Sequence, residues 1–114
     1  MTTFIDEDPI TPVSIEHLCE EIFEDGELEQ RYNYLSYVFE RDGVRLLARA
    51  YLDTAWTVSL FPPHHVEGPA DQFVEAPKMR EDAIAYFKRR YGEIKELSLT
   101  AGYVVIWSGA DENG

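Results

Sequence analysis

The chain has little of several residue types, and each shortage excludes a class of protein. One cysteine cannot form an internal disulfide, which predicts a reducing, cytoplasmic compartment. Seven glycines and six prolines in 114 residues are too few for a collagen-like or low-complexity chain. No uninterrupted apolar run is longer than that of Tyr103–Trp107, which is far shorter than the roughly 20 residues that cross a bilayer. The first eight residues lack the basic and apolar regions of a signal peptide, so none is expected.

Motifs typical of enzymes are missing from the sequence as well. The chain contains no glycine-rich phosphate loop, no H-E-x-x-H, no C-x-x-C and no G-x-S-x-G. These absences favour a non-enzymatic protein and predict neither a catalytic residue nor a cofactor.

What the chain does have is acidic charge, concentrated near its beginning. The formal net charge is −12, and residues 1–30 contain ten acidic residues and no Lys or Arg. Such a field repels the phosphates of nucleic acids and anionic membrane surfaces, so neither is an expected partner. It attracts basic proteins, either directly or as a mimic of a nucleic-acid backbone. The simpler alternative, that an acidic face keeps the protein in solution, stays open.

The pattern of residues 1–30 predicts an extended acidic arm followed by a helix. Pro9 and Pro12 favour an extended arm over residues 1–13, and Ser14 is a suitable helix N-cap. An apolar stripe at helical spacing follows, and three acidic residues at i+4 spacing lie opposite it. The stripe is Ile15, Leu18, Cys19, Ile22 and Phe23; the acidic residues are Glu16, Glu20 and Glu24; Gly26 would end the helix.

The rest of the chain alternates between strand patterns and one further helix. Strands are predicted at residues 31–40, 44–52 and 55–61, and Asp42-Gly43 is a strong signal for a tight hairpin. After an irregular loop at residues 62–76, Pro77 begins a helix with basic residues in its last turn and Gly92 at its C′ position. A closing hairpin spans residues 94–107, and residues 108–114 are expected to form a flexible tail.

These elements predict a single α+β domain over residues 14–107 with the order α-βββ-α-ββ. The economical arrangement is an antiparallel meander sheet with both helices packed mainly on one face. This order and the acidity resemble those of small acidic secretion chaperones, which are dimers that hold unfolded segments of exported proteins. The chain lacks their helix after the last hairpin and matches no motif of theirs residue by residue.

Tyr and Arg side chains alternate along the predicted strands and mark a candidate binding surface. These residue types are enriched at protein interfaces. An equally open alternative is that the arginines pair with the acidic first segment while the tyrosines cover the core. The candidate partner-binding residues are Glu16, Glu20, Glu24, Tyr32, Tyr34, Arg45, Arg49 and Tyr51, with Phe61 as a possible addition.

The loop at residues 62–76 contains the weak candidates for a metal or ligand site. His64 and His65 are adjacent, and Glu67 and Asp71 lie nearby in the sequence. Imidazole and carboxylate groups are suitable zinc ligands, but adjacent histidines rarely face the same ion, so we expect no metal site. Cys19 is expected to pack in the core as a small apolar residue.

The sequence therefore favours a non-enzymatic protein-binding module, such as an antagonist, immunity-like protein or nucleic-acid mimic that engages a basic partner. The alternatives are a small acidic chaperone-like homodimer, a plain homodimer whose Tyr-rich sheet face is the dimer interface, and a ligand-binding or enzymatic domain that uses the loop at residues 62–76.

Overall fold

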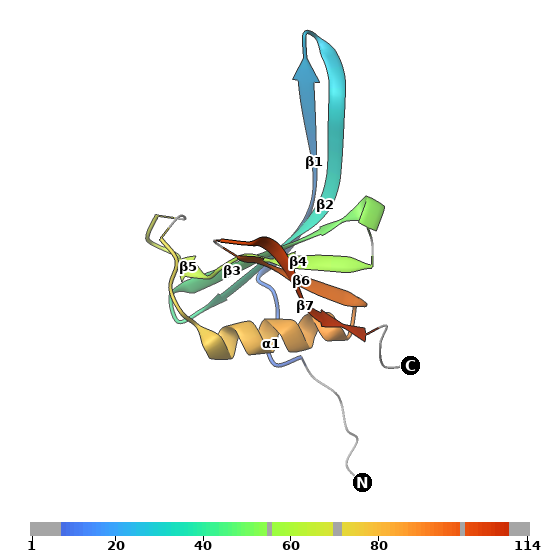
Figure 1. The fold of residues 1–114 in the computed structure, drawn as a ribbon. Helices are drawn as coiled ribbons and strands as arrows, with labels where there is room; N and C mark the ends of the chain where they lie inside the picture. The colour runs from blue at the N-terminus through green and yellow to red at the C-terminus, as the bar shows by residue number, and fades with distance from the viewer. Residues whose placement is uncertain (1–7, 55, 70–71, 99, 110–114) are drawn as a thin grey trace.

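The protein is described by a computed structural model over residues 8–54, 56–69, 72–98 and 100–109. Seven strands, one α-helix and a short 3-10 turn at Leu52–Thr54 make up the fold (Figure 1). The strands and the helix have these bounds: β1 Ser14–Glu24, β2 Glu27–Arg41, β3 Val44–Tyr51, β4 Thr57–Leu60, β5 His64–His65, α1 Pro77–Lys88, β6 Glu93–Ser98 and β7 Gly102–Ser108.

All seven strands belong to one mixed sheet. The main order is β1-β2-β3-β4-β6-β7, and the short β5 pairs with β3 beside β4. Neighbouring strands are antiparallel except β4 and β6, which are parallel because the chain returns through α1 before it forms β6. The predicted α+β fold is therefore wrong: the described chain is mostly β, with one helix and a mixed sheet. The resemblance to secretion chaperones rested on this element order and on acidity, and only the acidity remains.

The predicted first helix is the main error, because its residues form β1. Spacing of four residues places Glu16, Glu20 and Glu24 on one face in a strand as well as in a helix. The spacing of the glutamates therefore did not distinguish a strand from a helix. The deciding signal is Asp25-Gly26. Both residues have positive φ, 55° and 82°, which is the geometry of a two-residue hairpin turn. Cys19 is consequently exposed and not a core residue.

Asp42-Gly43 repeats the same turn between β2 and β3, with φ values of 50° and 77°, and here the predicted hairpin is confirmed. In both turns the glycine tolerates the left-handed conformation without a Cβ clash. The chain thus has two Asp-Gly hairpins in succession, which set the register of β1, β2 and β3.

The core lies between the sheet and α1. Strand residues such as Phe39, Leu46 and Ile94 are fully buried against Phe87 of the helix. The predicted helix from Pro77 is confirmed, with the proline in its first turn. Gly92, however, is not at the C′ position, because the helix ends with Arg89 as its C-cap. Gly92 instead allows the Trp56 indole to lie against the backbone, where the Cβ of any other residue would clash with the ring.

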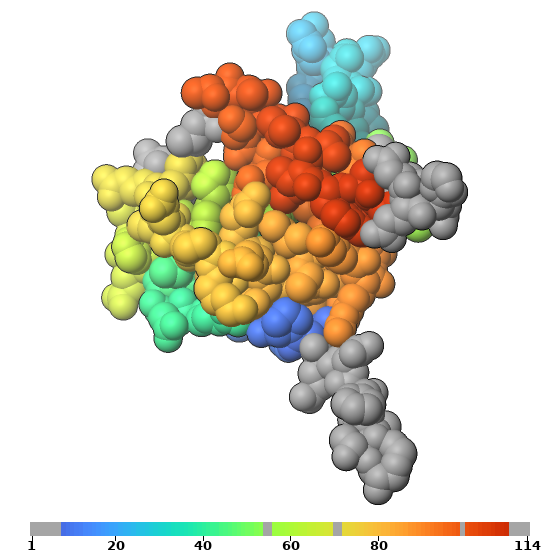
Figure 2. Space-filling model, turned by 60° about the horizontal axis from the view of Figure 1, so that its bottom comes forward, coloured from blue at the N-terminus to red at the C-terminus, as the bar shows by residue number. Residues whose placement is uncertain are grey.

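The described residues before β1 pack against the rest of the domain, which we call the body and which comprises α1 and the sheet outside residues 19–33 (Figure 2). Ile10 joins the core, and the Val13 amide donates to the Val38 carbonyl. Asp8 accepts from Arg89 and Arg90 beyond the end of α1, at 3.1 and 2.9 Å. These contacts fix residues 8–13 of the predicted arm. Residues 1–7, and residues 110–114 of the predicted tail, lie outside the described chain.

α1, with 12 residues, is the one α-helix of the described chain, and it is too short and too polar to span a bilayer.

Candidate functional site

β1 and β2 extend well beyond the rest of the sheet as a two-stranded projection (Figure 1). β3 pairs with β2 only as far as Tyr34, opposite Tyr51, so residues Cys19–Asn33 pair with each other alone. We call this segment the projecting hairpin. It runs from the Cys19–Asn33 pair to the Asp25-Gly26 turn, with a bulge between Ile22 and Phe23.

Negative charge on the projecting hairpin is poorly balanced. It contains one basic residue, Arg31, whose guanidinium donates two hydrogen bonds, of 2.6 and 2.9 Å, to the Glu21 carboxylate. Glu24 and Glu27 lie directly opposite each other across the strands, where like charges are destabilising. The acidic residues of the hairpin are Glu20, Glu21, Glu24, Asp25, Glu27 and Glu29.

Apolar side chains on the projecting hairpin are exposed on both of its faces. Phe23 and Leu28 form a cross-strand pair close to the turn, and Phe23 is 59% exposed. Ile22 is exposed on the opposite face. The apolar side chains of this segment are therefore interspersed with carboxylates on both faces.

The hairpin meets the body at a cluster on the sheet face opposite α1, which we call the open face. Tyr34 is only 3% exposed there, although no helix of the described chain covers it. Its hydroxyl donates to Glu20 at 2.7 Å, and the Arg49 guanidinium lies 4.5 Å from its ring centroid. The bond to Glu20, followed by burial, raises the pKa of Tyr34. Tyr51 packs against Tyr34 and Tyr32, with centroids 5.3 and 6.2 Å away.

Arg49 connects the hairpin side of this cluster, at Glu20, with its tyrosines and Phe61. Its Nη1 lies 3.9 Å from a Glu20 carboxylate oxygen and 3.4 Å from the Tyr51 hydroxyl. It also lies over the Phe61 ring, at 5.5 Å. The cation therefore touches β1, β2, β3 and the residue after β4, which fixes the base of the projecting hairpin.

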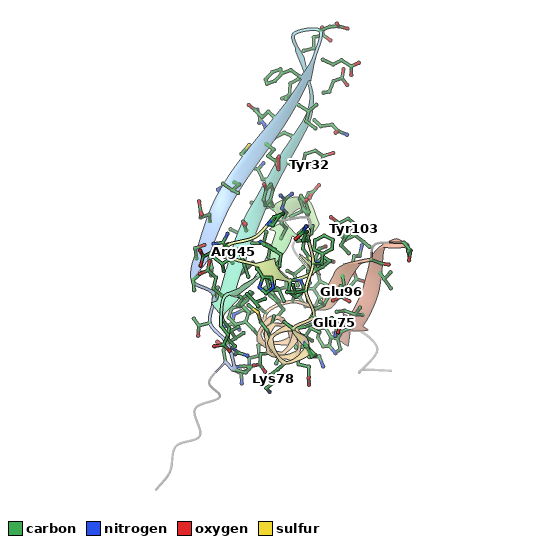
Figure 3. All side chains as sticks on the ribbon, turned by 90° about the vertical axis from the view of Figure 1, so that its left-hand side faces the viewer. Tyr32, Arg45, Glu75, Lys78, Glu96 and Tyr103 are labelled. Atoms are coloured by element: carbon green, nitrogen blue, oxygen red, sulfur yellow. The ribbon has the colours of Figure 1, made fainter. Side chains whose placement is uncertain are left out.

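A hollow of about 330 Å³ lies beside this cluster on the open face, between β3, β4, β6 and β7. Tyr103 is packed against Phe61, and burial raises its pKa. Figure 3 shows Tyr32 and Tyr103 on the side of the sheet away from Lys78 of the helix. The hollow is lined by Tyr51, Thr57, Ser59, Lys95 and Tyr103. Sequence reasoning missed Lys95 and Tyr103, although alternation along β6 and β7 places both on this face.

The predicted partner-binding residues lie on the same face of the sheet, but they do not form one cluster. Glu20, Tyr32, Tyr34, Arg49 and Tyr51 come together at the base of the hairpin, as described above, and Phe61 joins them. Glu16 and Glu24 lie on either side of Glu20 along β1. Arg45 lies at the far end of β3 and pairs with Glu40 at 2.6 Å. Arg31 and Arg49 thus approach carboxylates of β1, as expected if the arginines pair with the acidic first segment, whereas Arg45 does not.

The two histidines point in opposite directions because they are successive residues of β5. His64 is buried and forms an isolated bridge with Phe73, whereas His65 is exposed. Among the described residues, no group of three or more His, Cys, Asp or Glu side chains could hold a metal ion. Asp71 lies outside the described residues. The loop therefore does not bring its two histidines together.

In comparisons with family models, curated proteins and solved structures, the chain matches none.

Proposed function

We propose that the chain is a non-enzymatic protein-binding module of the cytoplasm that engages a basic protein through the projecting hairpin. Its role would be that of an antagonist, an immunity-like protein or a nucleic-acid mimic. The cytoplasmic location is part of the proposal and rests on the single cysteine.

The observation that carries the proposal is the projecting hairpin itself. A two-stranded ribbon is marginally stable in water, yet this one extends from the body with exposed apolar residues and opposed glutamates. These features oppose the stability of the free protein and are relieved when a basic surface lies against them. The alternative of a ligand site in the loop at residues 62–76 has less support, because His64 and His65 diverge.

The test is a comparison of two variants with the same change in net charge. The first replaces Glu24, Glu27 and Glu29 of the projecting hairpin by Gln. The second replaces Glu67, Glu75 and Glu81, which are exposed on the body, by Gln. Each immobilised protein is used to capture partners from a lysate at low salt, followed by elution with increasing salt.

We expect the wild-type protein and the body variant to retain the same basic protein, and the hairpin variant to lose it or release it at lower salt. Equal retention by both variants would show that the hairpin is not the binding surface.

A second candidate function, self-association, is favoured by the strand at the other edge of the sheet. Among the described strands, β7 pairs with β6 alone; it has no charged residue and exposes Tyr103, Val104 and Val105. Uncharged edge strands pair readily with another copy. Sedimentation of the wild-type protein at increasing concentration would then show a dimer that Val105→Lys abolishes; a monomer at all concentrations would contradict this candidate.

A further inference from the structure

Within the described part of the chain, the outer edge of β1 is unpaired along its whole length. β1 pairs with β2 on one side, and no described strand lies on the other. Every second residue of an edge strand directs its backbone N–H and C=O groups outward, where they can pair with an added strand. With 11 residues, nearly all of them exposed, β1 offers a longer open edge than β7 with its seven.

A third strand would remedy the weakness of the projecting hairpin. Three strands are needed for a sheet to be stable on its own in water, and residues Cys19–Asn33 have two. Addition at β1 would also cover side chains of Leu18 and Ile22 that are now exposed on one face. The geometry of the hairpin is therefore that of a template for strand addition.

The charge of β1 determines which strand it would accept. β1 contains four glutamates and no Lys or Arg. A second copy of β1 would place the glutamates of two chains beside one another, which is unfavourable. An uncharged strand would leave the glutamates of β1 without a counter-charge, whereas a basic strand would supply one.

The order of side chains along β1 specifies the partner further. On the face shared with Tyr34, β1 presents Glu16, Leu18, Glu20, Ile22 and Glu24 in succession, so that acidic and apolar side chains alternate. Side chains of an added strand stand beside those on the same face. A complementary strand has a basic residue at every fourth position and an apolar residue midway between.

We propose that β1 binds an extended basic segment of its partner as an added strand, with Lys or Arg residues four apart beside Glu16, Glu20 and Glu24. The inference rests on the proposed function and adds the form in which the partner is recognised. Backbone pairing would supply affinity, and the alternation of charge would supply register.

The test uses the synthetic peptide KTVTKTVTK, which has this pattern, and the full-length protein. Two further peptides of the same sequence and charge have methylated backbone nitrogens at alternate positions, one peptide for each edge of the extended strand. Binding is measured by calorimetry at low salt, and hydrogen exchange of the β1 amides is followed by NMR.

We expect the parent peptide to bind and to protect the outward amides of β1. The peptide methylated on the pairing edge should bind about tenfold more weakly or worse, because several ladder hydrogen bonds are lost. The peptide methylated on the other edge should bind like the parent, and it is therefore the matched control.

Equal binding of all three peptides, with no protection of β1, would overturn strand addition while leaving a basic partner at the hairpin in place. If no peptide binds the wild-type protein, or if the variant with Gln at positions 24, 27 and 29 binds the parent peptide as well as the wild type does, the proposed function fails too.

Discussion

The projecting hairpin and the body of this protein use apolar residues in opposite ways. The body buries Phe39, Phe87 and Ile94 completely between the sheet and α1. The hairpin leaves Phe23 and Leu28 exposed and holds opposed glutamates at its end. Burial drives folding, so the body accounts for the stability of the chain. The hairpin buries less apolar surface and contributes little to that stability, and its exposed side chains are the basis of the binding proposed above.

The largest difference between the body and the hairpin is expected when a phenylalanine of each is replaced by alanine. Phe87→Ala removes a fully buried ring and should lower the free energy of unfolding by about 3–5 kcal/mol. Phe23→Ala removes a ring that is 59% exposed and should change it by no more than about 0.5 kcal/mol. Urea denaturation measures both. A comparable loss in the two variants would show that the hairpin is part of the cooperative core.

The buried carboxylate of Asp82 makes the stability of the body depend on pH. Asp82 accepts from Arg41 at 2.7 Å and lies 3.1 Å from the Lys78 ammonium, and these contacts hold its pKa below the usual range. A carboxyl whose pKa is lowered by folding stabilises the protein above its unfolded pKa, near 4, and that stabilisation is lost as the pH falls through the lower, folded value.

Asp82→Asn should therefore lower the free energy of unfolding by about 2 kcal/mol at neutral pH, and its stability should fall less on acidification than that of the wild type. Urea denaturation at several pH values measures this, with the exposed Glu81→Gln as the control. Parallel acid profiles of Asp82→Asn and the wild type would contradict the assignment.

The two Asp-Gly turns allow the contrast to be tested with the same substitution. Gly26 and Gly43 have φ values of 82° and 77°, and no atom lies within 4 Å of an added Cβ in either turn. Alanine therefore strains the backbone by about 1–2 kcal/mol at both positions. Gly43→Ala should lower the stability of the whole domain, whereas Gly26→Ala should increase hydrogen exchange in the hairpin alone. Equal losses of global stability would refute independent behaviour of the hairpin.

The smallest effect is expected at the junction of the two regions. Tyr34→Phe removes the hydroxyl that donates to Glu20 at 2.7 Å and should cost about 1 kcal/mol. Tyr32→Phe removes a hydroxyl that donates to the exposed Gln30, and it is the control with little expected effect. NMR shifts of residues in the hairpin should change in the first variant more than in the second; the reverse order would contradict the role given to Tyr34.

Local features of the fold could be predicted where a residue type admits one conformation. Pro77 and the apolar spacing after it identified α1, and Asp42-Gly43 identified the second hairpin turn. The first segment was ambiguous because its four-residue spacing suits both a helix and a strand, and the Asp25-Gly26 turn was interpreted as a helix end. The parallel pairing of β4 with β6 joins strands separated by α1, and no local pattern encodes it.

The candidate site could be predicted in part for the same reason. Strand alternation placed Tyr34, Arg49 and Tyr51 on one face correctly. The projection of residues Cys19–Asn33 could not be predicted. It exists because β3 ends at Tyr51, whereas β2 extends beyond the residue that pairs with Tyr51. It is a difference in the lengths of paired strands, which only the assembled sheet defines.

The exposed thiol of Cys19 gives the molecule a ready point of chemical attachment. It is the only cysteine of the chain, and it lies at the base of the projecting hairpin. A maleimide fluorophore or nitroxide spin label would therefore modify the unmutated protein at a single position. Its anisotropy or line shape would report how freely the hairpin moves relative to the body, and how far a bound molecule restrains that motion.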